Sequence, residues 1–224
     1  MPATINSYIN DYLIASFVKD HAHLFSGKVL DIGCGNMRYK KTVLENKKVT
    51  EYIGLDLEEG KFTYSVSADM YWDGKQIPLP ENAVNGALLC EVLEHCSDPF
   101  VVLSESYRVL SPGGVLLLST PFLYQIHGAP FDYHRLTPFK IEEWCKKAGF
   151  SKVELFATGS YDTSLAQMLG IYIEHRPMPS LLRRILKRLL VPVIAITLHI
   201  EKNRKRRPIH EHDIMPGIVG IAYK

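Results

Sequence analysis

Several common signals are missing from this chain of 224 residues. It has four cysteines, Cys34, Cys90, Cys96 and Cys145, and no two of them form a Cys-x-x-Cys pair. The first ten residues are polar and contain neither the basic nor the apolar segment of a secretory signal. We therefore expect reduced thiols and a cytoplasmic protein.

An excess of charge of either sign is also absent. The formal net charge is +2, and 46% of the residues are hydrophobic while 22% are charged. These values are typical of a folded globular domain and argue against extensive disorder. The net charge by itself implies nothing about whether nucleic acid is a partner.

Short apolar runs alternate with amphipathic segments along most of the chain. This alternation predicts an α/β fold with a largely parallel sheet covered by helices on both faces. The expected strands are Lys28–Ile32, Glu51–Asp56, Thr63–Ala68, Gly86–Cys90, Val115–Thr120, Lys152–Ala157 and Ile218–Tyr223. The expected helices are Ser7–His23, Tyr39–Asn46, Pro99–Leu110 and Thr137–Ala148.

Residues 159–216 interrupt this alternation. They separate the last two expected strands by far more than the usual connection of about 4–6 residues. We expect one domain over residues 1–224, with 159–216 as a helical, basic and apolar insertion before the last strand.

The stretch "KVLDIGCGNMRY" combines a strand with a Gly-x-Gly turn at Gly33 and Gly35. Glycines there let a ligand approach the backbone closely. About twenty residues later, the next strand ends at Asp56, where a carboxylate can accept hydrogen bonds from a ribose. The third glycine of a dinucleotide site and the GxxxxGK[ST] loop of a triphosphate site are both missing. A ligand with a ribose and an adenine but no phosphate fits best.

Acidic residues follow two further expected strands. Asp69 follows the third, where it can accept a hydrogen bond from an adenine amine, and Cys90 and Glu91 end the fourth. The end of the fourth strand lies beside the change in strand order, where ligands bind in such sheets. A carbonyl or carboxylate at that point suits a cationic amino-acid group.

The segments "VLDIGCGN", "IGLDLE", "SADMYWDGKQIPLPENAVNGALLCEVLEH" and "VLSESYRVLSPGGVLLLSTPF" resemble the successive motifs of class I S-adenosylmethionine-dependent methyltransferases. The resemblance covers roughly residues 25–158 and the strand at 217–224. It implies a Rossmann-like sheet of seven strands with the last antiparallel, and S-adenosyl-L-methionine as cofactor. Asn36 stands where a third glycine is common, a change that the family tolerates.

The resemblance also implies roles for single residues. Gly33 and Gly35 would line the methionine moiety, Asp56 would bind the ribose, and Asp69 the adenine amine, while Glu91 and His95 would border the methyl donor. The cofactor-binding residues expected in full are Asp31, Gly33, Cys34, Gly35, Asp56, Leu57, Asp69, Met70, Cys90, Glu91 and His95.

A loop dense in polar side chains follows the fifth expected strand, between Thr120 and Pro138. His127 or His134 could act as a general base for the methyl acceptor. Asp132 could orient that histidine or take the proton itself. Tyr133 and Arg135 are expected to bind the acceptor, although Arg135 could instead pair with Asp132. Structural hydrogen bonds within the loop are the alternative for each of these residues.

The acceptor is less sharply defined. The loop is similar to methyltransferases that modify bacterial glycans and secondary metabolites, and "EVLEH" resembles methylases of quinone biosynthesis. We expect transfer to an O or N atom of a small-molecule, sugar or lipid-linked acceptor. The alternatives are a non-enzymatic module that binds the cofactor and a nucleic-acid methyltransferase. The latter is disfavoured because neither an NPPY-type tetrapeptide nor a catalytic Pro-Cys follows the fourth strand.

No metal is expected. His21 with His23, and His210 with His212 and Asp213, show no recognisable ligand pattern.

The segment Ser180–Pro208 is both basic and apolar. On a helix, the cations fall on one face and the leucine and isoleucine side chains largely on the other. The uncharged run Leu189–Ile200 is too short to span a bilayer, which needs about 20 apolar residues. The cations are Arg183, Arg184, Lys187 and Arg188. The apolar side chains on the opposite face are Leu182, Ile185, Leu186 and Leu189.

Three roles remain open for this segment. Residues 181–207 could contact the inner face of a membrane peripherally, form a homodimer, or act as a lid over the acceptor. The run Lys202–Arg207 has no aromatic residues within it, so nucleic acid is an unlikely partner.

Overall fold

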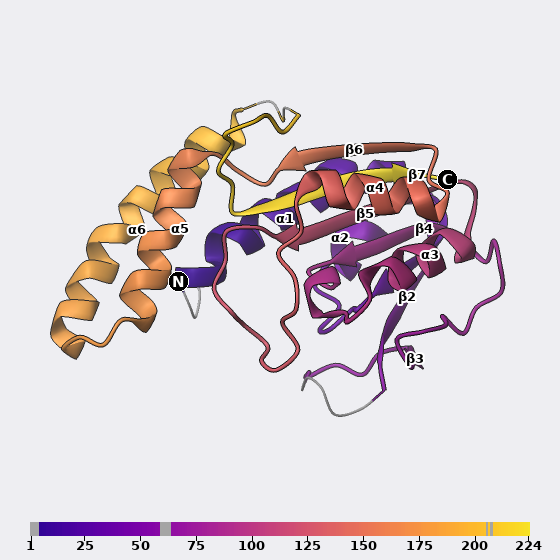
Figure 1. Cartoon of the computed structure of the whole chain (residues 1–224), viewed down its shortest axis with the longest axis horizontal. Coiled ribbons are helices and arrows are strands. Elements are labelled where there is room, and N and C mark those ends of the chain that lie inside the picture. Colours follow the sequence, from indigo (N-terminus) through magenta and orange to yellow (C-terminus); the bar gives the residue numbers. More distant parts are fainter. Residues whose placement is uncertain (1–4, 59–63, 205, 207) are drawn as a thin grey trace.

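The computed structural model describes residues 5–58, 64–204, 206 and 208–224. Its centre is a seven-stranded sheet in the order β3-β2-β1-β4-β5-β7-β6 (Figure 1). All neighbouring strands are parallel except β7, which runs antiparallel to β5 and β6. This confirms the predicted fold class. The strands are β1 (Gly27–Ile32), β2 (Val49–Leu57), β3 (Met70–Trp72), β4 (Val84–Cys90), β5 (Leu110–Pro121), β6 (Lys152–Ala157) and β7 (Gly217–Tyr223).

One predicted strand is wrong. Of the expected strand Thr63–Ala68, the described residues 64–68 are not extended into the sheet, and Thr63 lies outside the described residues. The alternation of "YSVSA" resembles a half-buried strand, but Tyr64 and Val66 are exposed. The sheet instead takes Met70–Trp72, whose Trp72 fills the core beside β2. Burial of the large indole therefore sets the register, and Asp69 precedes β3 instead of following it.

Helices cover both faces of the sheet. On one face, α3 (Pro99–Val109) and α4 (Pro138–Ala148) bury apolar side chains against the strands. On the other, α1 (Ile5–His21) and α2 (Lys40–Leu44) do the same. Two short 3-10 turns, η1 (Ala22–Leu24) and η2 (Leu93–His95), follow α1 and β4. The predicted ends of α4 are confirmed, because the Thr137 side chain accepts a hydrogen bond from the Lys140 amide and Gly149 has a φ of 116°.

The insertion folds into α5 (Tyr161–His175) and α6 (Ser180–Lys202). These helices lie side by side as a hairpin that projects beyond the end of the sheet where the parallel strands finish (Figure 1). Ile9 and Leu13 of α1 form a separate apolar cluster with residues of both helices. None of the described helices has the length and apolar character needed to cross a membrane.

Candidate functional site

Two adjoining cavities open where the parallel strands end. The larger, about 430 Å³, lies between the ends of β2 and β3 and the start of α3. The smaller, about 290 Å³, lies over the ends of β1 and β4 and is bounded by α1. They share Gly33, Tyr64, Glu91 and His95, so together they form one branched site. A cavity of about 640 Å³ between α1 and the end of α6 contains none of the predicted site residues.

The glycine loop has the backbone shape that the sequence predicts. Gly33 and Gly35 have φ values of +71° and +49°, in the region that favours glycine. A Cβ atom on Gly33 would lie 2.4 Å from the Cγ2 atom of Val92, so no larger residue fits there. The loop is held to β2 by hydrogen bonds from the Gly33 and Cys34 amides to the Leu55 carbonyl, at 2.8 and 3.0 Å. Bare backbone therefore faces both cavities.

Asp56 ends β2 at the edge of the larger cavity. Its two carboxylate oxygens accept hydrogen bonds from the Gly35 and Leu57 amides, each at 2.8 Å. The Cys34 thiol also donates to Oδ2, at 3.9 Å. A carboxylate has about four acceptor positions, so these bonds fix the side chain and still leave a position for a ribose hydroxyl. Leu57 and Asp56 both line the cavity. The acceptor positions of Asp56 thus fit the ribose of an adenosyl group.

Asp69 and Met70 do not lie where the sequence predicts. Asp69 accepts a hydrogen bond from the Gly54 amide at 2.7 Å, and Met70 packs beside the core. Neither lines either cavity. Asp73 follows β3, lines the larger cavity, and accepts hydrogen bonds from the Lys75 and Gln76 amides at 2.8 and 3.1 Å. The Asp-Gly turn signal directly after Trp72 could have identified it.

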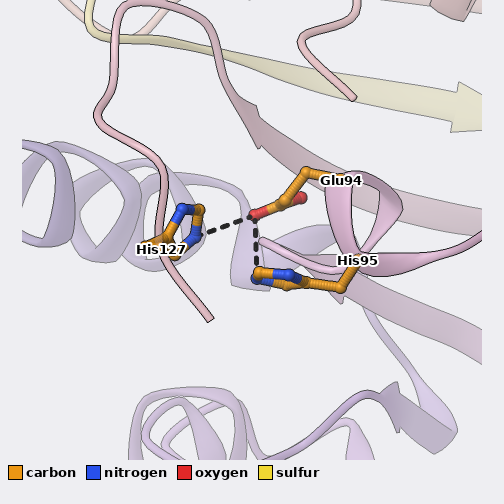
Figure 2. A group of neighbouring side chains, drawn as sticks. All are labelled: Glu94, His95 and His127. Atoms are coloured by element: carbon orange, nitrogen blue, oxygen red, sulfur yellow. Dashed lines mark ion pairs between the residues drawn. The ribbon is translucent and has the colours of Figure 1, made fainter. Parts of the chain in front are cut away.

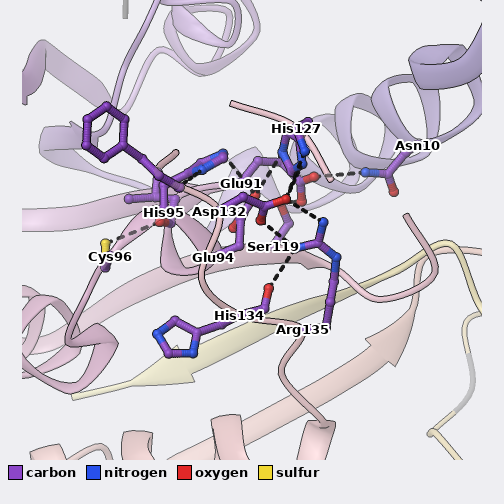
Figure 3. Close-up of polar contacts among 12 residues, drawn as sticks. Asn10, Glu91, Glu94, His95, Cys96, Ser119, His127, Asp132, His134 and Arg135 are labelled. Carbon is purple, nitrogen blue, oxygen red and sulfur yellow. Dashed lines mark hydrogen bonds and ion pairs between the residues drawn. The ribbon is translucent and has the colours of Figure 1, made fainter. Parts of the chain in front are cut away.

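Glu91 joins the two cavities at the point where the strand order changes. Its φ of +57° is unusual for a residue other than glycine and turns the chain sharply after β4. Asn10 of α1 donates to Oε2 and the Ser119 hydroxyl donates to Oε1, both at 2.9 Å (Figure 3). Burial raises the pKa of Glu91 to about 7. Asn10 lies far away in the sequence and no motif marked it.

Three more of the predicted cofactor residues line the smaller cavity: Asp31, Cys34 and Cys90. Asp31 is buried in β1 and accepts a hydrogen bond from the Tyr52 hydroxyl. Burial raises the pKa of Asp31 to about 7, because the ionised form loses its contact with water.

The loop between Thr120 and Pro138, which we call the acceptor loop, contains an ion pair between Asp132 and Arg135. Two hydrogen bonds join the two side chains, at 2.6 and 2.8 Å (Figure 3). Arg135 also donates to the carbonyl groups of His134 and Gln125. Its guanidinium group is therefore committed to the loop, which favours the pairing alternative over binding of an anionic acceptor. Arg135 holds the pKa of Asp132 well below its ordinary value, so this carboxylate is ionised and a weak base.

The two candidate histidines differ. His127 lines the smaller cavity, and its Nδ1 lies 3.3 Å from Oδ2 of Asp132. Burial, and then the neighbouring His95, lower the pKa of His127, so its ring is neutral near pH 7. The ring of His134 points away from His127, and His134 lines neither cavity (Figure 3). Tyr133 is half exposed and also lines neither.

Glu94 is a residue that the sequence analysis overlooked. Its side chain is fully buried in η2, and Oε1 lies 3.8 Å from Nε2 of both His95 and His127 (Figure 2). The ligand atoms of these three residues lie within 4.8 Å of one another. Nδ1 of His21 and Nδ1 of His23 instead lie 2.8 Å from carbonyl oxygens of α1, those of Phe17 and Asp20. The "EVLEH" segment placed Glu94 one residue before His95, but only the fold brings His127 to them.

We expect the adenosyl part of the site to depend on Asp56 and Asp73 and not on Asp69. Asp56→Ala and Asp73→Ala should each weaken binding of S-adenosylhomocysteine by about tenfold or more, the effect of losing a hydrogen bond to a charged group. Asp69→Ala is the matched control and should leave the affinity close to that of the unmodified protein. Calorimetric titration measures all four. A larger loss for Asp69→Ala than for Asp73→Ala would restore the original assignment.

Asp31 should make stability depend on pH. Its pKa rises from 3.8 to about 7 in the folded protein, so the folded state binds a proton that the unfolded state has released. The free energy of unfolding therefore falls as pH rises from about 4 to about 7, by about 1.4 kcal/mol per pH unit from this residue, and then levels off. Asp31→Asn keeps an acceptor for Tyr52 but removes this slope. Urea unfolding of both proteins at about pH 5, 6, 7 and 8 tests this. Parallel curves would contradict the assigned pKa.

Comparison with known proteins identifies a methyltransferase domain in the chain. A family profile described as a methyltransferase domain matches residues 30–118. The chain is 27% identical to a ubiquinone biosynthesis O-methyltransferase of Nitrosococcus oceani, over 67% of this chain and 74% of that protein. It is 40% identical to a malonyl-[acyl-carrier protein] O-methyltransferase of Yersinia pestis, over 41% of this chain and 36% of that protein. The second match thus spans only about a third of its relative.

Solved structures show the same fold. A SAM-dependent methyltransferase from Archaeoglobus fulgidus superimposes with a TM-score of 0.57 at 18% identity, over 95% of this chain and 94% of the other. The [4+2]-cyclase SpnF gives 0.58 at 20% identity, over 94% of this chain and 79% of the other. The strand order, the glycine loop and the sequence matches lead to one conclusion. Residues 30–118 form a methyltransferase domain, and the chain has the fold of class I S-adenosylmethionine-dependent methyltransferases.

Proposed function

We propose that this methyltransferase acts on a hydroxyl oxygen of a small, lipid-linked acceptor that enters the smaller cavity. The observation that carries the proposal is the position of His127. Its neutral ring lines this cavity and is backed by the ionised Asp132. The two relatives described above are both O-methyltransferases by name, which supports oxygen over nitrogen.

The cofactor supplies an activated methyl group on a sulfonium. Transfer is a displacement in which the oxygen–carbon bond forms as the sulfur–carbon bond breaks, and the hydroxyl must lose its proton. The protein therefore has to position the oxygen and promote that loss. Among the candidates in the acceptor loop, His127 suits this role, because Asp132 is a weak base and His134 points away. The ionised Asp132 stabilises positive charge on the His127 ring.

The histidine assignment gives a direct test. His127→Ala should lower kcat for a hydroxyl acceptor by about 100-fold, the lower end of what a positioned proton acceptor contributes. His134→Ala should retain most of the activity, and both should bind S-adenosylhomocysteine normally. The assay measures transfer of labelled methyl from S-adenosylmethionine to phenols, with amines of similar shape as the comparison. Turnover of amines but not phenols would refute the oxygen assignment.

A lipid-linked acceptor is supported by the hairpin. Apolar side chains spaced three or four residues apart form a stripe along the exposed side of α6, while a different set faces α1 and α5. Exposed apolar stripes of this kind mark interaction surfaces. The stripe consists of Leu182, Ile185, Leu189, Val193, Ile196 and Ile200. Of the predicted apolar set, Leu186 packs inward instead.

The cations of α6 divide in the same way. Arg183 donates to two carbonyl groups at the end of α5, and Lys187 pairs with Glu174 at 2.5 Å. Arg184 and Arg188 are exposed beside the apolar stripe. Arg204 pairs with Asp162, Arg206 with Asp20, and Lys205 and Arg207 lie outside the described residues. An apolar stripe with adjacent arginines is typical of a helix lying in the interface of an anionic membrane. We infer peripheral contact of this kind through residues 181–207.

Vesicle binding tests this inference. Leu189→Asp combined with Ile196→Asp should reduce sedimentation with phosphatidylglycerol vesicles by about tenfold, since each change removes a buried apolar side chain from the interface. Phe139→Asp is the matched control, because Phe139 is 75% exposed on α4, away from the hairpin. Equal vesicle binding by all three proteins would contradict membrane contact. If the unmodified protein is a dimer that does not bind vesicles, and the double variant is a monomer, the stripe is a homodimer interface.

A further inference from the structure

The Glu94 side chain presents an electrostatic problem that the methyltransferase fold does not explain. It is fully buried, and neither carboxylate oxygen has a hydrogen-bond partner among the described residues. A buried carboxyl group without partners is costly, and proteins resolve this cost with a proton or a cation.

The histidines beside Glu94 are oriented as ligands. Nδ1 of His95 lies 2.6 Å from the Phe131 carbonyl oxygen, which only accepts hydrogen bonds, so Nδ1 carries the proton. This leaves a lone pair on Nε2, which faces Glu94 (Figure 2). His127 has a similar orientation: its Nδ1 lies 3.3 Å from Asp132, although not in hydrogen-bond geometry, and its Nε2 lies toward Glu94. A carbonyl or carboxylate behind each imidazole is the arrangement that orients histidine ligands around metal ions.

The distances suit one ion. Ligand atoms bound at about 2.1 Å to the same ion are at most about 4.2 Å apart. The three atoms here already lie within 4.8 Å, so small side-chain movements bring them into range. Two imidazoles and one carboxylate suit first-row transition metals better than magnesium or calcium, which prefer oxygen ligands alone. Three protein ligands also leave positions open, as in catalytic sites.

We propose that Glu94, His95 and His127 bind one divalent transition-metal ion, with Zn²⁺ and Mn²⁺ as the probes. His95 and His127 both line the smaller cavity, so an open coordination position would face the acceptor. Metal binding itself stands on this geometry alone; its catalytic role rests on the proposed function. A hydroxyl bound to the ion releases its proton to water more readily, and its oxygen lone pair then forms the bond to the methyl carbon while the sulfur keeps the electron pair. His127 would thus act through the ion instead of taking the proton.

The first experiment measures metal binding without activity. The full chain is treated with a chelator and titrated with ZnCl₂ and then MnCl₂ by calorimetry. We expect one ion per chain for at least one of the two metals. Glu94→Gln, His127→Ala and His95→Ala should each lower the affinity at least about tenfold, the lower end of the effect of losing a single supporting partner. His23→Ala is the matched control, because this exposed histidine lies on a different surface and should bind as the unmodified chain does.

Two further readouts separate ligation from a structural role. Asp132→Asn should lower the metal affinity by about 10–100-fold without removing a ligand. Glu94→Gln should preserve the melting temperature of the metal-free protein, since a neutral amide of the same shape replaces a buried carboxyl group that has no hydrogen-bond partner among the described residues, while abolishing the increase that metal gives the unmodified chain. Circular dichroism confirms that each variant is folded.

The outcomes distinguish this inference from the proposed function. No binding of either metal, or equal binding by the three ligand variants and the unmodified chain, would overturn the metal site. If His127→Ala still abolished transfer to phenols in that case, the proposed function would stand with His127 as base. One bound ion with ligand-dependent affinity but no transfer to any hydroxyl would support the metal site and refute the hydroxyl acceptor.

Discussion

The carboxylate of Glu91 holds the site together. It receives hydrogen bonds from Asn10 on α1 and from Ser119 on β5, while Glu91 itself directly follows β4. Three elements distant in the sequence are thus fixed to one side chain at the point where the strand order changes. Since α1 also packs against α5 and α6, the same contact links the floor of the cavities to the hairpin. A change at Glu91 would therefore affect the shape of the site as well as its charge.

The positive φ of Glu91 has a second consequence. By turning the chain sharply after β4, it directs the following residues into η2, which lies beneath the acceptor loop. The Tyr133 and His134 amides then donate to the Glu94 carbonyl, at 2.8 and 3.3 Å, and fix the loop to η2. This backbone contact, rather than any motif, places His127 beside Glu94. Strain at the end of one strand is thus connected to the arrangement of the acceptor loop.

The sequence predicted the sheet better than the site. Strong apolar runs located six strands, most clearly β1, β4, β5 and β7, whose apolar residues are buried on both faces. The prediction of the third strand was wrong because "YSVSA" has the alternating pattern of a strand. The connection after β2 is long enough for Met70–Trp72 to pair with β2 instead, and burial of Trp72 sets the register of that pairing. Asp73 was missed for the same reason. Cofactor residues near the first two strands were easier, since the glycine turn and Asp56 depend on local geometry that the sequence encodes directly.

Contacts between distant segments could not be read from the sequence. Asn36 illustrates this: it replaces a common glycine, yet its side chain accepts hydrogen bonds from the amide and hydroxyl of Ser65 and so holds the segment that carries Tyr64 beside both cavities. Asn36 thus lacks the backbone freedom of a glycine, but its side chain forms hydrogen bonds that link the glycine loop to Ser65. Asn10 and Glu94 were likewise invisible until the fold was known, because their partners lie far from them or depend on a loop.

Charge connects the cofactor with the buried acids around it. Asp31 and Glu91 both line the smaller cavity, and burial raises the pKa of each to about 7. A sulfonium cofactor brings positive charge into this region, which favours the ionised form of every carboxyl group nearby. By linkage, groups that ionise when a cation binds make that binding stronger as pH rises. With a sulfonium in the smaller cavity, the acids that weaken the fold near neutral pH would also favour a cationic methyl donor over its neutral product.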